Sequence, residues 1–226
     1  MTDNSITIIK LRLEILPKAQ RDVYPHLMPI KDLGFTLFGG TALALQLGHR
    51  ESIDFDFFTD KNISYMQSAL LNLNNIEVSE ITQQTINTLS FKTTNNVKLS
   101  FFGNIEFIKH SNKIYSYDGI LRLADLKSLL ITKLKATCDR AEYKDYKDIV
   151  EILKTKEVTL EEGLCGFRQY FGNDFPIVQI LKGLTYYEDG DLQRLSKDDK
   201  EILLNATKNI DISKIDIVKS KAKRQK

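Results

Sequence analysis

The segment that most constrains the fold of this chain covers residues 37–59 and reads LFGGTALALQLGHRESIDFDFFT. A short apolar run ends at Gly39 and Gly40, a stretch of helix-forming residues follows, and Gly48 stands where a helix C-terminal cap is expected. The pattern then changes to strict alternation in SIDFDFFT, which predicts a strand. The segment therefore predicts two strands joined through a helix.

The second of these strands contains two aspartates. Alternation places Asp54 and Asp56 on one face and Phe55 and Phe57 on the other. Carboxylates about 7 Å apart at their Cα atoms can hold one hard divalent cation, or one each of two cations. The solvated face of an antiparallel strand would show the same alternation, although aspartate is disfavoured in strands.

The glycine pair before the helix indicates a phosphate site. Glycine lets the backbone approach a ligand closely, and the free N–H groups at a helix N-terminus bind anions. Thr41 adds a hydroxyl donor. A tight strand-to-helix turn is the simpler alternative, but such a turn needs one glycine and rarely two. We therefore expect a phosphate site at Gly39 and Gly40 beside a metal site at Asp54 and Asp56.

Composition limits the other classes. Of the 226 residues, 42% are hydrophobic and 27% charged, as in globular proteins with a sizeable core. No apolar run approaches the roughly 18 residues of a membrane span, and two cysteines suit reduced thiols in the cytoplasm. A net charge of +2 argues against electrostatic coating of nucleic acid but leaves local docking of RNA open. Basic residues gather in the last stretch, VKSKAKRQK, which suits either phosphate contact or a solvated terminus.

The order of patterns predicts an α+β protein, with a mixed sheet flanked by helices followed by a helical C-terminal region. Residues 1–123 should form the sheet domain, with short N-terminal helices, and residues 124–226 a helical domain with the basic tail. Beyond the first segment, a helix is expected at 64–74 and strands at 88–94, 97–103, 105–110 and 113–117.

A second motif lies in the helical half, in KLKATCDRAEYKDYKDIVEIL. On a helix, Lys133 and Arg140 share one face two turns apart, and Asp145 and Asp148 share another. An ordinary pair of salt-bridged helices would give the same pattern. If the motif serves a nucleotide site, Lys133 can neutralise a phosphate, and Asp145 can be a third acid that binds metal or acts as base.

Two known families resemble these motifs. DFDFFT is similar to the Asp-x-Asp signature of haloacid-dehalogenase-type phosphatases, but their first Asp follows a hydrophobic strand, whereas here GHRES precedes the pair. The glycine pair, thirteen residues and then Asp54-x-Asp56 resemble the DNA polymerase beta-like nucleotidyltransferase superfamily. Within that superfamily, Gly-Gly-Thr with Arg50, and the helical Lys133, Arg140 and Asp145, resemble the AbiEii/AbiGii-type toxin nucleotidyltransferases.

That resemblance implies an enzyme that uses Mg²⁺, or Mn²⁺ in its place, to transfer a nucleoside monophosphate from an NTP to an acceptor hydroxyl on tRNA or protein. It implies a cytoplasmic bacterial toxin with a cognate antitoxin. The implied catalytic residues are Asp54, Asp56, Lys133 and Asp145, with metal at the first two and nucleotide at Gly39, Gly40, Thr41, Arg50, Lys133 and Arg140.

One departure keeps two alternatives open. Many members of the superfamily have a third carboxylate on a later strand, where this chain has Ser100, and Glu106 is an unconvincing substitute. A degenerate fold that binds nucleotide or RNA without catalysis is therefore the alternative function. A pure protein-interaction module would bind no nucleotide with Mg²⁺ at all.

Overall fold

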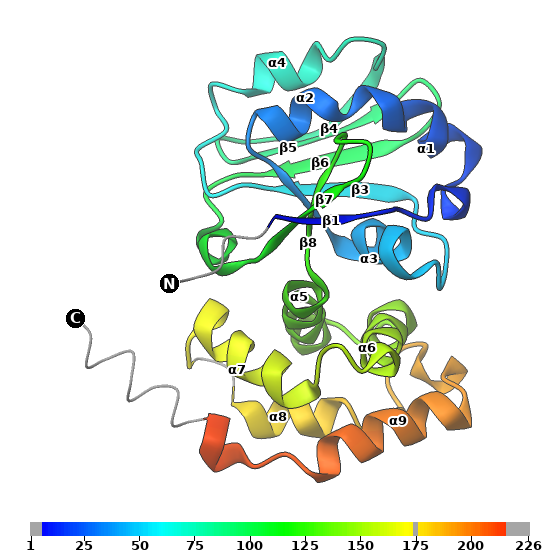
Figure 1. Cartoon of the computed structure of the whole chain (residues 1–226), viewed down its shortest axis with the longest axis vertical. Coiled ribbons are helices and arrows are strands. Elements are labelled where there is room, and N and C mark those ends of the chain that lie inside the picture. Colours follow the sequence, from blue (N-terminus) through cyan, green and yellow to red (C-terminus); the bar gives the residue numbers. More distant parts are fainter. Residues whose placement is uncertain (1–5, 174–175, 216–226) are drawn as a thin grey trace, which may run out of the picture. The chain divides into compact units, whose positions relative to one another are not determined.

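The computed structural model describes residues 6–173 and 176–215. The chain divides into two compact units, Met1–Asp125 and Leu126–Lys226 (Figure 1), close to the predicted boundary at 123/124. The basic tail at 219–226 lies outside the described residues.

The first unit is built on an eight-stranded sheet with the order β1-β7-β8-β2-β3-β6-β5-β4. The pairs β1/β7, β2/β8 and β3/β6 are parallel, and the other four pairs are antiparallel, so the predicted mixed sheet is confirmed. The strands are β1 (Thr7–Ile9), β2 (Thr36–Phe38), β3 (Asp54–Phe58), β4 (Val78–Gln84), β5 (Thr88–Thr93), β6 (Lys98–Phe102), β7 (Lys113–Ser116) and β8 (Arg122–Ala124).

Short helices flank this sheet, with α1, α2 and α4 on one side of it in Figure 1. They are η1 (Leu13–Ile15), α1 (Lys18–Val23), η2 (Tyr24–His26), α2 (Met28–Asp32), α3 (Gly39–Leu47), α4 (Gln67–Leu71) and η3 (Glu106–His110). Helix α3 ends as predicted, because Gly48 takes the left-handed conformation of a C-terminal cap.

Around β3 and β6, part of the core of this unit lies against one face of the sheet. Phe55 and Phe57 on β3 are buried, and the Phe57 ring stacks on Phe101 of β6 at 5.4 Å between centroids. Phe91 of β5 also packs on the Phe101 ring, at 5.8 Å between centroids. Because side chains alternate along each strand, this apolar face fixes the opposite face as the one that presents the polar residues of β3 and β6.

The second unit is helical, as predicted. It contains α5 (Leu126–Asp139), α6 (Tyr143–Thr155), α7 (Leu160–Phe171), α8 (Ile177–Gly183), η4 (Leu192–Arg194) and α9 (Lys197–Lys208). Helix α7 begins at a capping box in which Thr159 and Glu162 satisfy each other's backbone N–H groups. Its Gly163 and Gly166 face Leu130 and Ile131 of α5 so closely that no Cβ would fit without movement.

The predicted strand at 105–110 is wrong, because these residues form the 3₁₀ helix η3. Asn104 adopts a left-handed conformation with φ 59°, which turns the chain after β6, and the N–H of Ile108 then bonds to the carbonyl of Ile105 in the 3₁₀ pattern. Strands β1, β4 and β8 were not predicted. They are short or lie at an edge of the sheet, where hydrophobic alternation is weak.

Candidate functional site

Asp54 and Asp56 lie on β3 as the sequence predicts, on the face opposite the buried Phe55 and Phe57. Both aspartates are partly exposed. Phe57 packs on Phe101 on the opposite face of the strand. This packing fixes the strand, and with it the spacing of the two carboxylates. Their positions suit oxygen ligands that point away from the apolar layer.

Gly39, the first residue of α3, lies directly against Asp56. Its φ is +72°, a conformation that favours glycine, and a Cβ built on it would stand 2.8 Å from Asp56 Oδ2. The preceding residue, Phe38, pairs with Asp56 across β2 and β3. The N-terminus of α3 is therefore in contact with the carboxylate of Asp56. A larger side chain at Gly39 would displace that carboxylate.

Gly40 brings two further polar groups to the same helix end. A Cβ on Gly40 would lie 2.7 Å from a terminal guanidinium nitrogen of Arg50 and 2.8 Å from the Ser52 hydroxyl. The first N–H groups of a helix have no partner within it, so backbone donors and the Arg50 cation lie together here. Ser52 was not among the residues predicted for the nucleotide site.

Thr41 is fully buried, and its hydroxyl donates to the backbone carbonyls of Asp54 and, at 3.4 Å, of Ser52. The Thr41 hydroxyl, which we expected to face a phosphate, thus connects α3 to the start of β3 through hydrogen bonds. Only its backbone N–H, in the first turn of the helix, remains for a ligand.

The register of β3 and β6 adds two residues to the face of the aspartates. Ser100 pairs with Asp56, and Lys98 pairs with Asp54. Paired residues of neighbouring strands point to the same side of a sheet, and the stacked rings of Phe58 and Phe102, one pair further along, show this directly. Ser100 therefore lies beside Asp56, and it is 2% exposed.

This pair of carboxylates fits Mg²⁺. Among the described residues, no group of three or more His, Cys, Asp or Glu side chains is placed to hold a metal ion. A metal ion at Asp54 and Asp56 would therefore not be coordinated by protein side chains alone. Mg²⁺ needs no such cage, since it is held by one or two carboxylates together with substrate phosphates and water. A phosphate at the N-terminus of α3 would provide the missing oxygens.

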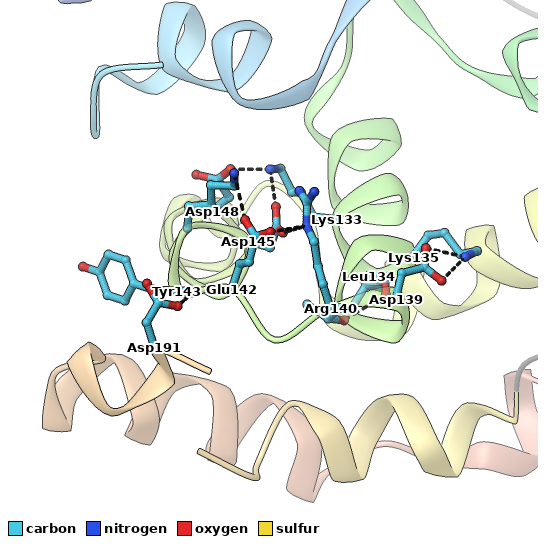
Figure 2. Close-up of polar contacts among 12 residues, drawn as sticks. Lys133, Leu134, Lys135, Asp139, Arg140, Glu142, Tyr143, Asp145, Asp148 and Asp191 are labelled. Atoms are coloured by element: carbon cyan, nitrogen blue, oxygen red, sulfur yellow. Dashed lines mark hydrogen bonds and ion pairs between the residues drawn. The ribbon is translucent and has the colours of Figure 1, made fainter. Parts of the chain in front are cut away.

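The second unit contains an ionic cluster of Lys133, Arg140, Asp145 and Asp148 (Figure 2). Lys133 Nζ lies 2.7 Å from Asp145 Oδ1 and 2.7 Å from Asp148 Oδ2, and Arg140 Nε lies 2.8 Å from Asp145 Oδ2. Both aspartates are completely buried, and the Lys133 side chain is 9% exposed. The predicted helical motif is thus brought together within its own unit, with Arg140 one residue beyond the end of α5.

The charges of this cluster are coupled. Burial alone would raise the pKa of Asp145, but the hydrogen bond from Arg140 and the nearby charge of Lys133 outweigh burial and lower it. The same hydrogen bond raises the pKa of Arg140. Asp145 is therefore a carboxylate held ionised, which makes it a weak base. Lys144, by contrast, pairs with Glu142 at 2.8 Å on the surface.

Within the described part of the chain, no helix has the length and apolarity that crossing a membrane requires. Cys138 and Cys165 are free thiols.

The mixed sheet, with a glycine pair at the start of α3 and two aspartates on the next strand, is the arrangement expected of a nucleotidyltransferase. Comparison with known families agrees. The profile of a family described as nucleotidyl transferase AbiEii toxin, of a type IV toxin–antitoxin system, matches residues 28–209. The chain belongs to this family of nucleotidyltransferase toxins.

Two individual proteins are similar to this chain. An uncharacterised protein of Aquifex aeolicus (strain VF5) is 30% identical over 177 residues, which cover 77% of this chain and 84% of that protein. The crystal structure of an antigenic nucleotidyltransferase-like protein from Paracoccidioides brasiliensis matches with a TM-score of 0.48 and 15% identity, covering 88% of this chain and 91% of that one.

Proposed function

We propose that this protein transfers a nucleoside monophosphate from a nucleoside triphosphate to an acceptor hydroxyl, with Mg²⁺ or Mn²⁺ bound at Asp54 and Asp56. The observation that supports this most is the contact between Asp56 and Gly39, because the carboxylate that we propose as a metal ligand lies against a helix end suited to phosphate. The acceptor oxygen forms a bond to the α-phosphorus while the bond from that phosphorus to the bridging oxygen of pyrophosphate breaks. Pyrophosphate leaves with the electron pair, and the hydroxyl proton is lost to a base.

The residues of the first unit would bind and orient the triphosphate. The N–H groups of Gly39, Gly40 and Thr41 and the guanidinium of Arg50 can donate to phosphate oxygens. A bound divalent ion would neutralise charge on the phosphates and polarise the reacting oxygen. Catalysis of this kind depends mainly on positioning and on stabilisation of charge.

The ionic cluster of the second unit would be required for transfer. Burying several charges costs free energy, and perturbed titrating groups concentrate at functional sites. Lys133 is the predicted phosphate ligand of this cluster and Asp145 its predicted acid. The lowered pKa of Asp145 favours a role in holding Lys133 and Arg140 over a role as base.

Family membership supports the biological part of the proposal. A toxin of a toxin–antitoxin system acts beside an antitoxin, which we propose as the partner of this protein in the bacterial cytoplasm. The acceptor hydroxyl would belong to tRNA or to a protein.

A transfer assay tests the proposal. Purified protein would be incubated with each of four α-³²P-labelled NTPs, Mg²⁺ and a bacterial extract, and label would be followed into the RNA and protein fractions. We expect label transfer by the wild type and none by Asp54→Asn or Asp56→Asn. Asp60→Asn, just beyond the end of β3, is the matched control and should transfer like the wild type. Equal behaviour of the wild type and Asp54→Asn would refute the proposal.

The buried Ser100 beside Asp56 favours the second candidate, a fold that binds nucleotide without turnover. Calorimetry separates the two candidates. Mg²⁺-dependent NTP binding together with no transfer to any fraction would support the binding protein over the enzyme.

A further inference from the structure

The polar face of the sheet continues past the aspartates in two rows of paired residues. One row contains Asp56, Ser100 and Ser90, and the other contains Asp54, Lys98 and Lys92. In the second row, the partly exposed Lys98 stands directly beside Asp54, a predicted metal ligand, on parallel strands about 5 Å apart. This row adds a cation to the first unit that the sequence motifs do not include.

The two lysines of this row differ in their partners. Lys92 Nζ forms an ion pair with Glu80 on β4, at 3.4 Å. Lys98 forms no ion pair or side-chain hydrogen bond with any residue in the ranges 6–173 and 176–215. A lysine on a strand beside an aspartate, without a partner of its own, has its full charge available to a ligand.

Charge balance indicates which ligand that is. Asp54 and Asp56 carry two negative charges, which one divalent ion offsets, so the charge of a triphosphate needs further cations. Arg50 at Gly40 is one of them. We infer that Lys98 is another, and that it binds an oxygen of the triphosphate beside Asp54; this inference rests on the proposed function. Because Ser100 is neutral, no third carboxylate on β6 competes with a phosphate for the ammonium group of Lys98.

Inorganic triphosphate with Mg²⁺ is the appropriate probe, because it contains the phosphate chain and no base. Binding to the full chain would be measured by calorimetry for the wild type, Lys98→Met, Lys98→Gln, Lys98→Arg and the control Lys92→Met. Removing the Lys98 charge should raise Kd about 10- to 100-fold, as expected for loss of a charged hydrogen bond. Lys98→Arg should recover most of the affinity, and Lys92→Met should stay within about twofold of the wild type.

The outcomes separate this inference from the proposed function. If Asp54→Asn abolishes triphosphate binding while Lys98→Met and Lys98→Gln bind like Lys92→Met, the inference fails and the proposed function stands. If the wild type itself binds no triphosphate in the presence of Mg²⁺, both fail. Thermal unfolding of each variant identifies any that do not fold, and Lys98→Gln and Lys98→Arg, which retain a long polar side chain, then decide the question.

Discussion

At the scale of the residue, Gly39 has two separate reasons to be glycine. Its φ of +72° disfavours any side chain, and a Cβ would collide with Asp56 Oδ2. Gly119 has the first reason alone, with φ +74° and no atom within 4 Å of a Cβ. The two positions therefore distinguish backbone strain from displacement of the carboxylate.

We predict that Gly39→Ala and Gly119→Ala each lower the free energy of unfolding by about 1 to 2 kcal/mol, and that only Gly39→Ala weakens binding of Mg²⁺ and triphosphate. Urea unfolding and calorimetry measure the two effects. Unchanged affinity in Gly39→Ala would show that the Asp56 carboxylate does not hold the metal in this position.

Lys133 also matters at this scale, because it forms ion pairs with two buried carboxylates. Lys133→Met leaves Asp145 and Asp148 without that charge and should lower the free energy of unfolding by about 3 to 5 kcal/mol. Lys135→Met, two residues further along α5, removes a more exposed partner of Asp139 and should cost less than about 1 kcal/mol. Chemical unfolding of both variants tests this, and similar losses would contradict the buried cluster.

The pKa of Asp145 predicts a dependence of stability on pH. Because the folded state lowers this pKa, the carboxylate stabilises the fold above its unfolded pKa of about 4. That stabilisation is lost as pH falls through the lower folded value. Asp145→Asn should therefore be less stable than the wild type at pH 7 and lose less stability on acidification. Urea unfolding from pH 7 to pH 2.5 measures this, and parallel curves for the two proteins would be the contrary result.

At the scale of the element, hydrophobic pattern and glycine placement predicted β2, α3 and β3, because each is specified by its own residues. Sequence alone could not predict η3, where the left-handed conformation of Asn104 turns the chain after β6 and a 3₁₀ helix follows. It could not predict the parallel pairing of β3 with β6 either, and that pairing is what places Lys98 beside Asp54. Alternation in VKLSFFG does put Lys98 and Ser100 on one face, but not next to a particular strand.

Close packing of α7 on α5 gives a prediction for a whole element. Alanine stabilises exposed helices relative to glycine, but a Cβ on Gly166 would lie 2.9 Å from Ile131 Cγ1, and Ile131 is buried. We expect Gly166→Ala to lower the melting temperature, at a cost of about 1 to 3 kcal/mol from overpacking. In Gly183→Ala on α8, the nearest atom to the new Cβ is Tyr146 Oη at 3.9 Å, so the melting temperature should not fall. An unchanged melting temperature in Gly166→Ala would contradict this packing.

At the scale of the whole molecule, the glycine–aspartate motif and the Lys133 motif lie in different halves of the sequence. In the structure each motif lies inside one compact unit. The local geometry of each motif was predictable from periodicity, whereas the ion pairs of Lys133 with Asp145 and Asp148 depend on how α5 and α6 pack. Sequence spacing does not encode that packing. The same limit applies to the contact of Gly40 with Arg50 and Ser52.

The division of residues between the units leads to a last prediction. The groups of the first unit that we propose to bind metal or triphosphate all lie in residues 1–125, which have a sheet and a core of their own: Asp54, Asp56, the N-terminus of α3, Arg50 and Lys98. Lys133, the phosphate ligand predicted from the sequence motif, lies in the second unit and is paired with Asp145 and Asp148, so we expect it to contribute little to binding of the triphosphate. The fragment 1–125 should therefore unfold cooperatively and bind Mg²⁺ with triphosphate within about threefold of the full chain, a difference below about 1 kcal/mol. It should transfer no nucleotide, because the Lys133 cluster is absent. Calorimetry and the labelled-NTP assay test the two parts separately. A folded fragment with affinity reduced a hundredfold would show instead that Lys133 or Arg140 binds the triphosphate, as the sequence motif alone suggests.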